Sequence, residues 1–183
     1  MSGPEPATAP SDRELIARWR DGDERAAAEL VRRHTPAVAR FLAAQGARQD
    51  LDDLVQETFF RAFRRIDSFR ERASFRTWVM AIGSNALRDL GRRRRRNVLP
   101  LDDREIPDVR GDPHAAMLEG DLLGRLEGAV RELPPMQRNV FLMRAQQGAE
   151  YGEIAEALGT SVGAARVHYH HAVNRLKEAL TEE

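Results

Sequence analysis

The 183-residue sequence contains no cysteine. This absence excludes disulfide bonds, thiolate metal sites and a cysteine nucleophile, and it is compatible with a reducing compartment. The sequence also lacks the run of about eighteen apolar residues that a membrane-spanning helix needs. Its first residues, MSGPEPATAPSD, lack the charged and then apolar pattern of a secretory signal. We therefore expect a cytoplasmic protein with no membrane span.

Net charge is absent as well, because 29 lysine and arginine residues balance 29 aspartate and glutamate residues. Any attraction to nucleic acid must come from local patches, so we expect the free chain to bind DNA weakly. With 42% hydrophobic and 32% charged residues, the composition is typical of a soluble protein. The length allows one ordinary domain or two small ones.

The alternation typical of β-strands is missing too, whereas apolar residues recur every three or four positions along most of the chain. This spacing predicts an all-α fold. Ser11 and Glu14 form a capping-box pattern before a short helix, and Asp50 and Ser74 can cap two later helices. Pro36 lies within a helical stretch, where we expect a kink or a new helix start.

Composition divides the chain into four segments. Residues 1–10 are rich in Pro, Ala and Gly, and we expect them to be disordered. Residues 11–96 form a first helical domain, and residues 116–183 form a second one. Between them, residues 97–115 carry prolines and an acidic excess, which is typical of a linker. The predicted fold is two small helical domains joined by a flexible linker.

The first domain carries two charged surfaces. An acidic patch stands at a helix start and comprises Asp52, Asp53, Gln56 and Glu57. The helix macrodipole favours carboxylates there, so helix stability alone can explain the patch. The arginines from Arg92 to Arg96 continue the outer side of a helix that also carries Asn85 and Arg88. This position favours phosphate contact, and the alternative is a solvated helix end.

The second domain ends in the pattern of a helix-turn-helix. A helix from Tyr151 to Leu158 is followed by a Gly159-Thr160 turn and by a last helix that Ser161 can cap. The last helix offers small residues, one arginine and three histidines, which can approach phosphates or base edges. These candidates are Ser161, Gly163, Ala164, Arg166, Val167, His168, His170 and His171. The alternative is a helical hairpin with a solvated face.

Few residues suggest catalysis. His168 and His171 share a helix face, but no carboxylate converges on them and their spacing is not that of a known metal-binding helix. The sequence has neither a glycine-rich phosphate loop after a strand nor a serine elbow. We therefore expect no enzyme, no metal site and no cofactor. Phe75 and Trp78 lie on an apolar stripe and are expected to be core residues.

Four segments together resemble the extracytoplasmic-function (ECF) group of bacterial sigma-70 factors. They are DLVQETF (53–59), DSFRERASFRTWVMAIGSNALRD (67–89), LPPMQRNVF (133–141) and YGEIAEALGTSVGAARV (151–167). The resemblance extends from about Leu15 to Leu180 in the order and spacing of the family. The first domain resembles the sigma-2 domain and the second the sigma-4 domain, while the sigma-3 domain of primary sigma factors has no counterpart.

The resemblance implies a sigma factor that binds core bacterial RNA polymerase and directs promoter-specific transcription initiation. It implies that the acidic patch docks on the clamp of the polymerase β′ subunit. It also implies that the loop before the third long helix, together with that helix, binds and melts the minus-ten element, with a flipped base read in the loop. The residues concerned are Asp67, Ser68, Phe69, Arg70, Ser74, Arg76, Asn85, Arg88, Arg92 and Arg93.

By the same resemblance, the last helix reads the minus-thirty-five element while the preceding helices contact the polymerase β flap. The stretch from Arg166 to His171 has histidines where the family commonly has arginines, and Glu150 and Gly152 also depart from its pattern. Because neutral histidine attracts phosphate less than arginine does, we predict weaker and more pH-dependent minus-thirty-five binding. An anti-sigma factor is an expected partner. The alternative function is a stand-alone helix-turn-helix regulator whose first domain senses a ligand or partner.

Overall fold

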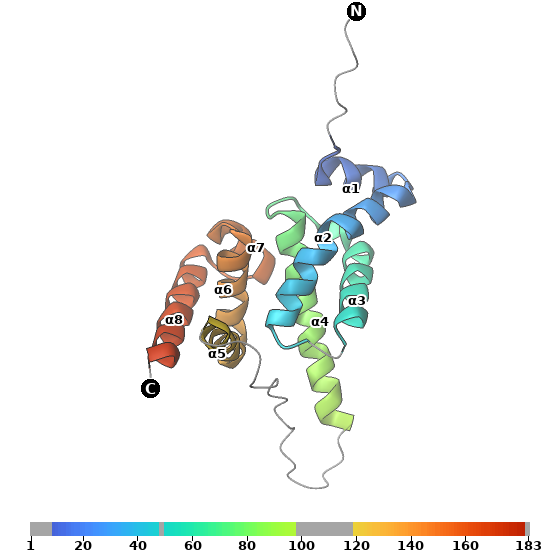
Figure 1. Cartoon of the computed structure of the whole chain (residues 1–183). Helices are drawn as coiled ribbons and strands as arrows, with labels where there is room; N and C mark the ends of the chain where they lie inside the picture. The colour runs from blue at the N-terminus through green and yellow to red at the C-terminus, as the bar shows by residue number, and fades with distance from the viewer. Residues whose placement is uncertain (1–8, 48–49, 98–118, 182–183) are drawn as a thin grey trace, which may run out of the picture.

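The computed structural model describes residues 9–47, 50–97 and 119–181, in which all regular elements are helices (Figure 1). They are α1 (Asp12–Arg20), α2 (Glu24–Ala44), α3 (Leu51–Arg64), the short 3₁₀ helix η1 (Ile66–Ser68), α4 (Phe75–Asn97), α5 (Glu119–Glu132), α6 (Pro135–Gln147), α7 (Tyr151–Leu158) and α8 (Val162–Thr181). The all-α prediction is confirmed. The segment predicted to be a linker lies outside the described residues, apart from Asn97.

The predicted helix caps have different outcomes. At α1, the Ser11 hydroxyl accepts a hydrogen bond from the Glu14 N–H at 3.3 Å, and the Glu14 carboxylate accepts one from the Ser11 N–H at 2.7 Å. This capping box and the Ser74 cap of α4 are confirmed. Asp50 occupies the N-cap position of α3, but its carboxylate binds Arg94 of α4 and caps nothing. The prediction for Asp50 is wrong because a guanidinium offers a carboxylate a stronger hydrogen bond than a backbone N–H does.

Pro36 lies inside α2, which continues without interruption from Glu24 to Ala44. The prediction of a new helix start there is therefore wrong. Proline removes one intrahelical hydrogen bond, but α2 buries Val38 and Phe41 completely against its neighbours. Tertiary packing of this apolar face holds the helix together across the proline.

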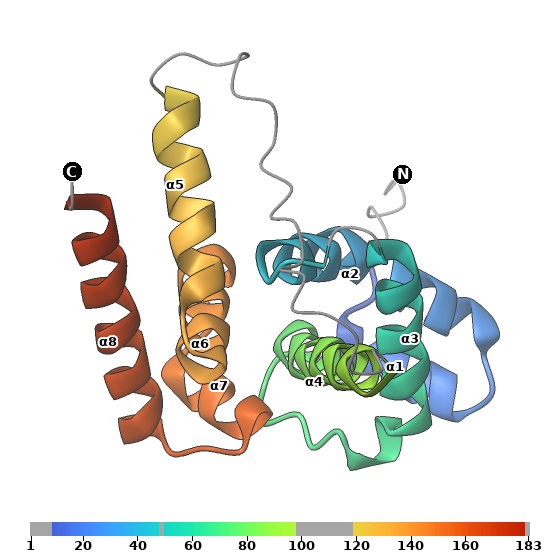
Figure 2. The same ribbon diagram turned by 90° about the horizontal axis from the view of Figure 1, so that it is seen from below.

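Helices α1 to α4 form a first group around a core of large side chains that includes Phe41, Phe75 and Met80. Figure 2 shows α4 flanked by α2 and α3. Gly83 allows this close approach, because a Cβ atom there would lie 3.1 Å from Thr58 Oγ1 and 3.2 Å from Leu42 Cδ2. The middle of α4 is therefore enclosed, while its last turns extend beyond the other helices (Figure 1).

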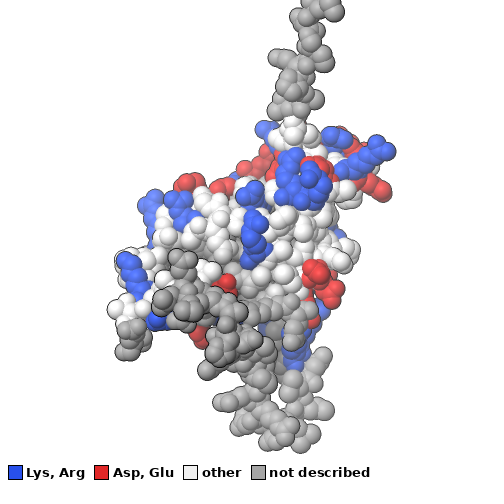
Figure 3. Space-filling model, in the orientation of Figure 1, with Lys and Arg blue, Asp and Glu red and all other residues white. Residues whose placement is uncertain are grey.

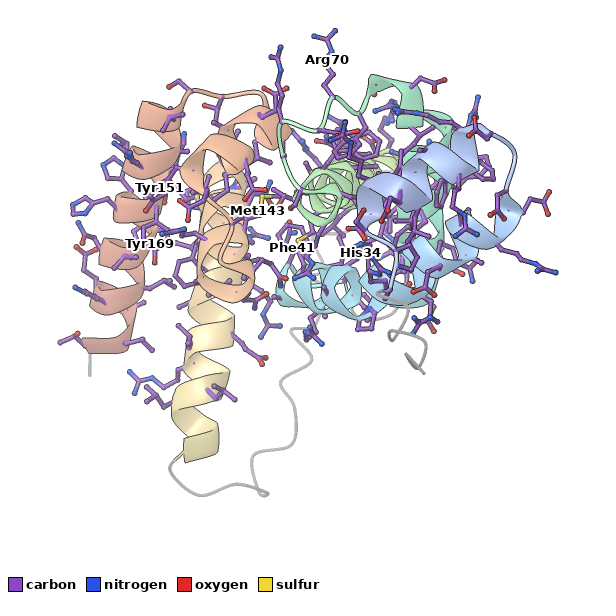
Figure 4. The ribbon with its side chains drawn as sticks, turned by 90° about the horizontal axis from the view of Figure 1, so that it is seen from above. His34, Phe41, Arg70, Met143, Tyr151 and Tyr169 are labelled. Atoms are coloured by element: carbon purple, nitrogen blue, oxygen red, sulfur yellow. The ribbon has the colours of Figure 1, made fainter. Side chains whose placement is uncertain are left out.

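Helices α5 to α8 form a second group. Gly148 and Gly159 adopt left-handed conformations, with φ of 67° and 65°, and so end α6 and α7. Tyr169 of α8 packs between Phe141 of α6 and Tyr151 of α7, with ring centroids 6.1 and 6.0 Å apart. Figure 4 shows both tyrosines within this group. These contacts fix α8 against the two helices that precede it.

The two groups lie side by side, with α6 and α7 of the second group packed against α2 and α4 of the first (Figures 1 and 2).

Around α1, basic and acidic side chains lie next to one another on the surface (Figure 3). No described helix has the length and apolar character needed to cross a bilayer.

Candidate nucleic-acid and partner interface

The acidic patch of α3 is exposed at all four predicted positions, Asp52, Asp53, Gln56 and Glu57. Asp53 and Glu57 border a cavity of about 210 Å³ between α3 and α4, which arginines also line. Glu57 accepts a hydrogen bond from Arg61 Nε at 2.7 Å. The patch thus presents negative charge beside the basic end of α4.

Arg61 and Asp89 connect the acidic patch to α4, and sequence reasoning missed both. Arg61 Nη1 donates to Asp89 Oδ2 at 2.9 Å, and Arg92 pairs with the other oxygen of Asp89. Hydrogen bonds from Arg61 and then Arg92 hold the pKa of the Asp89 carboxyl below its usual range. The four-residue spacing from Glu57 to Arg61 hinted at a helix pair, but only packing brings Asp89 into reach.

The loop from Asp67 to Ser74 is built on an aromatic floor. Phe69 is buried and packs against Phe75 and Trp78, with centroids 5.8 and 5.0 Å apart. The core prediction is confirmed for Phe75, whereas Trp78 is only half-buried. Phe69 and Trp78 also line a cavity of about 350 Å³ at the loop. The predicted site residue Phe69 therefore supports the loop from beneath instead of lying on its surface.

The outer part of this loop is exposed. Asp67, Ser68, Arg70 and Ser74 all reach solvent, and Arg70 projects away from the fold in Figure 4. Glu71 has a positive φ of 56°, a strained conformation for a residue other than glycine, and pairs with Arg13 at 3.3 Å. This turn presents the neighbouring arginines at the tip of the loop.

Helix α4 carries the other predicted minus-ten residues, distributed around more than one side of the helix. Arg76, Asn85, Arg88, Arg92 and Arg93 are all exposed. Arg88 hydrogen-bonds the Asn85 side chain one turn away, and both border a cavity of about 560 Å³ between the two helical groups. The structure thus brings these residues onto one helix, immediately after the loop.

The helix-turn-helix prediction is confirmed in its geometry, because α7, a left-handed Gly159 and α8 follow in the expected order. Ser161 caps α8 by accepting a hydrogen bond from the Ala164 N–H at 3.1 Å. Exposed on the last helix and at its start are Ser161, Gly163, Arg166, Val167, His170 and His171, with Ala164 and His168 half-buried.

The basic side chains of α8 have few partners among the described residues. The Arg166 guanidinium lies 5.7 Å from the centroid of the Tyr151 ring, and His170 contacts Asn174 at 3.1 Å. The buried Nδ1 atom of His168 has no hydrogen-bond partner. Within residues 9–47, 50–97 and 119–181, no cluster of three or more His, Cys, Asp or Glu side chains is arranged to hold a metal ion.

The predicted minus-ten and minus-thirty-five residues lie on separate surfaces. The former belong to the first helical group and the latter to α8, with α7 packed against both α4 and α8 (Figure 2). Carboxylates of α7 reach the minus-ten loop, a contact that sequence reasoning missed. Ser74 donates its backbone N–H to Glu153 Oε1 at 2.7 Å, and Arg72 pairs with Glu156 at 3.9 Å.

Two family models match the chain in this order. Sigma-70 region 2 matches residues 30–97, and sigma-70 region 4 matches residues 123–176. The first match covers most of α2 together with α3 and α4, and the second covers most of α5 to α8. Both surfaces described above therefore lie within matched regions.

Similar proteins agree with these matches. The chain is 31% identical over 166 residues to the ECF RNA polymerase sigma-E factor of Haemophilus influenzae, covering 85% of this chain and 88% of the relative. It is 36% identical over 167 residues to the RNA polymerase sigma factor CnrH of Cupriavidus metallidurans, covering 84% and 86%.

Solved structures show the same likeness. A structure of CnrH in complex with the cytosolic domain of CnrY has a TM-score of 0.69 and 30% identity, covering 92% of this chain and 96% of that one. The sigma factor RpoE from Bartonella quintana, in complex with the anti-sigma factor NepR, has a TM-score of 0.65 and 27% identity, covering 81% and 92%. With both regions matched in order and relatives of this identity along most of its length, the chain belongs to the ECF sigma factors of the sigma-70 family.

Proposed function

We propose that this sigma factor docks on core RNA polymerase through the acidic patch of α3 and reads promoter DNA with the loop, α4 and α8. Membership of the family makes the protein an initiation factor that directs RNA polymerase to promoters. The finer assignment of roles to individual residues is our proposal. We expect the protein to act in the cytoplasm without catalytic activity of its own.

The observation that carries this proposal is that an acidic and a basic surface lie on two helices packed together, α3 and α4. Buried apolar side chains pack α3 against α4, and the Arg61 to Asp89 contact at 2.9 Å joins their charged surfaces. A sigma factor must hold polymerase with one face and promoter DNA with another. When both faces lie on helices that are packed together, polymerase bound at the first face positions the DNA at the second. The patch would meet the β′ clamp and the outer face of α4 the DNA backbone.

The loop supports a role in reading a base. Its cavity of about 350 Å³ has an aromatic floor and a polar rim that includes Ser68 and Arg72. An unstacked base needs an apolar or aromatic surface for its ring and hydrogen-bonding groups for its edge. The cavity supplies both kinds of group. Arg76 and Arg88, exposed on the adjoining helix, would anchor the flanking phosphates.

The second helical group supports a role in reading duplex DNA. The start of α8 carries Gly163 and Ala164, which allow the backbone to approach a groove closely, followed by Arg166 and three histidines. We assign the minus-thirty-five element to this face and the polymerase β flap to the preceding helices. An anti-sigma factor is a further expected partner, since RpoE from Bartonella quintana is solved in complex with one.

Run-off transcription tests the proposal directly. Purified core polymerase is incubated with fragmented genomic DNA in the presence or absence of the chain, and the transcripts are sequenced to locate their start sites. We expect start sites that depend on both components and share motifs near minus ten and minus thirty-five. A chain that protects specific DNA sites by itself, without stimulating initiation, would instead support the stand-alone helix-turn-helix regulator.

A further inference from the structure

Helix α1 contacts the minus-ten loop, residues 67–74, where that loop begins. Arg20, the last residue of α1, donates a hydrogen bond from Nη2 to the Ile66 carbonyl oxygen at 2.9 Å, and its Nε atom lies 3.8 Å from Asp67 Oδ1. The same carbonyl accepts the Phe69 N–H at 3.1 Å, which closes the turn of η1. One guanidinium therefore holds the turn from which the loop departs.

A second contact from α1 reaches the tip of the loop. Arg13 Nε lies 3.3 Å from Oε2 of Glu71, the residue with the positive φ of 56°. Such a conformation persists only where neighbouring groups hold it, because it is strained for a residue with a Cβ atom. The two side chains are 82% and 39% exposed, and an exposed ion pair contributes little by itself. Arg13 therefore constrains the loop less than Arg20, whose side chain is 37% exposed.

The position of α1 is fixed independently of the loop. Leu15 and Ile16 are each 1% exposed and pack into the core of the first group. The Trp19 ring packs edge-on against Phe63 of α3, with ring centroids 5.3 Å apart. Figure 1 shows α1 at the end of the first group where α4 begins, opposite the extended last turns of α4. Because apolar packing anchors α1, its arginines hold the loop against a fixed support.

The family match gives α1 no role. Sigma-70 region 2 matches residues 30–97, which include the loop and α4 but not α1. The loop is also supported from beneath, since Phe69 packs against Phe75 and Trp78. That aromatic floor fixes one side of the loop cavity, whereas Ser68 and Arg70 on its rim are exposed. The contacts from α1 flank these two exposed residues and so restrain the part of the loop that the floor leaves free.

We propose that α1 is the outer support of the minus-ten loop, with Arg20 and Arg13 as positioning residues that sharpen the choice of base. This inference rests on the proposed function, in which the loop reads a base. A hydrogen bond to the edge of a base weakens steeply outside a narrow range of distance and angle. A loop held in one conformation therefore discriminates between bases, whereas a loop that moves adapts to a wrong base.

Base selectivity is measured with holoenzyme, assembled from core polymerase and the full chain, on a promoter located by run-off transcription. Its affinity is determined for this promoter and for a copy in which one minus-ten base is replaced. The replaced base is the one whose substitution weakens binding by the unsubstituted protein most. The ratio of the two affinities is the selectivity.

Arg20→Ala should lower this ratio about fivefold, as the loss of one hydrogen bond from a charged group suggests. The matched control is Arg25→Ala, which removes an exposed arginine from the first turn of α2 and should leave the ratio unchanged. An unchanged ratio in Arg20→Ala would overturn the inference. An equal loss of affinity for both promoters would overturn it as well, because that is the effect of removing a direct phosphate contact.

Arg13 and Glu71 are tested as a pair. Arg13→Ala and Glu71→Gln should each lower the ratio about twofold, and the double variant should lower it no further, because both changes remove the same contact. If Arg13 instead binds a DNA phosphate directly, Glu71→Gln leaves it free to do so, and affinity then rises for both promoters without a change in their ratio. That result contradicts a positioning role for Arg13.

Hydrogen exchange and urea unfolding separate positioning from a general loss of stability. In Arg20→Ala, the backbone amides of residues 67–71 should exchange faster than in Arg25→Ala, at a similar free energy of unfolding. A loop that exchanges equally fast in both variants contradicts the inference.

Arg70→Ala distinguishes failure of this inference from failure of the proposed function, because Arg70 lines the loop cavity. A lower ratio in Arg70→Ala beside an unchanged ratio in Arg20→Ala would show that the loop reads a base without help from α1. Unchanged ratios in both variants would remove the loop from base reading, and the inference would fall with that part of the proposed function.

Discussion

Helices α4 and α8 both expose a face proposed to meet DNA, but with different chemistry. On α4 the exposed basic residues are arginines, and neighbours hold three of them, Arg88 by Asn85, Arg92 by Asp89 and Arg94 by Asp50. On the first half of α8, one arginine is followed by three histidines. Arginine keeps its charge at any physiological pH, whereas histidine changes charge within that range.

The two helical groups therefore offer DNA side chains that respond differently to pH. The first group joins a face of arginines to a face of carboxylates through Arg61 and Asp89, and neither face contains a histidine. The second group adds a reader whose phosphate attraction depends on protonation. Three experiments test this contrast, and they are given in order of decreasing expected effect.

The largest effect is expected at the acidic patch. Gln56→Ala combined with Glu57→Ala should weaken association with core polymerase by at least about tenfold, as loss of contacts at the centre of an interface does. The dissociation constant is measured by fluorescence anisotropy of the labelled chain as core polymerase is added. Glu24→Ala, which removes an exposed carboxylate at the start of α2, is the matched control. Unchanged association in the double variant would remove α3 from the polymerase interface.

A smaller effect is expected on α8. Holoenzyme should bind its promoter about threefold more tightly near pH 6 than near pH 8 at fixed salt, because protonated histidine attracts phosphate. His168→Ala with His171→Ala should reduce this dependence, since His170 remains. As a counterpart on α4, Arg88→Ala should lower affinity by the same factor at both pH values. The contrast between the helices fails if the histidine variant keeps the full pH dependence.

The smallest effect concerns His34, a buried histidine of the first group. Burial lowers its pKa below the usual 6.5, and the pairing of Nε2 with Asp12 at 2.7 Å opposes the shift only in part. Arg76 and Arg33 lower the pKa further. Below pH 6.5, His34 therefore binds a proton more readily in the unfolded chain than in the folded one. The free energy of unfolding should consequently fall as the pH falls through this range.

Urea unfolding of the full chain between about pH 7 and about pH 5.5 measures this dependence. His34→Gln should flatten it, whereas substitution of the exposed His170 in the same way should leave it unchanged. The same residue type would then affect stability in one group and DNA binding in the other. An identical slope in His34→Gln and the unsubstituted protein would show that His34 does not cause the effect.

Local signals in the sequence predicted much of this fold. Ser11, Ser74 and Ser161 cap helices as expected, since a side-chain cap depends only on residues three positions away. The helical spacing of apolar residues along the chain is confirmed in α8, where Ala165, Ala172 and Leu176 are buried. The expected cap by Asp50 and the expected new helix start at Pro36 failed, because a distant arginine and the packing of α2 overrode the local preference.

In the candidate site, too, some features were predictable from the sequence and others depended on tertiary packing. Spacing along the chain and the order of motifs were enough to assign the acidic patch, the loop, α4 and α8 to candidate surfaces, because each of these is a local feature of one helix or turn. Tertiary structure alone decided that Arg61 meets Asp89, that Phe69 supports the loop from beneath, and that Glu153 reaches Ser74. The partners of that last hydrogen bond stand 79 positions apart, and no periodicity carries information over that distance.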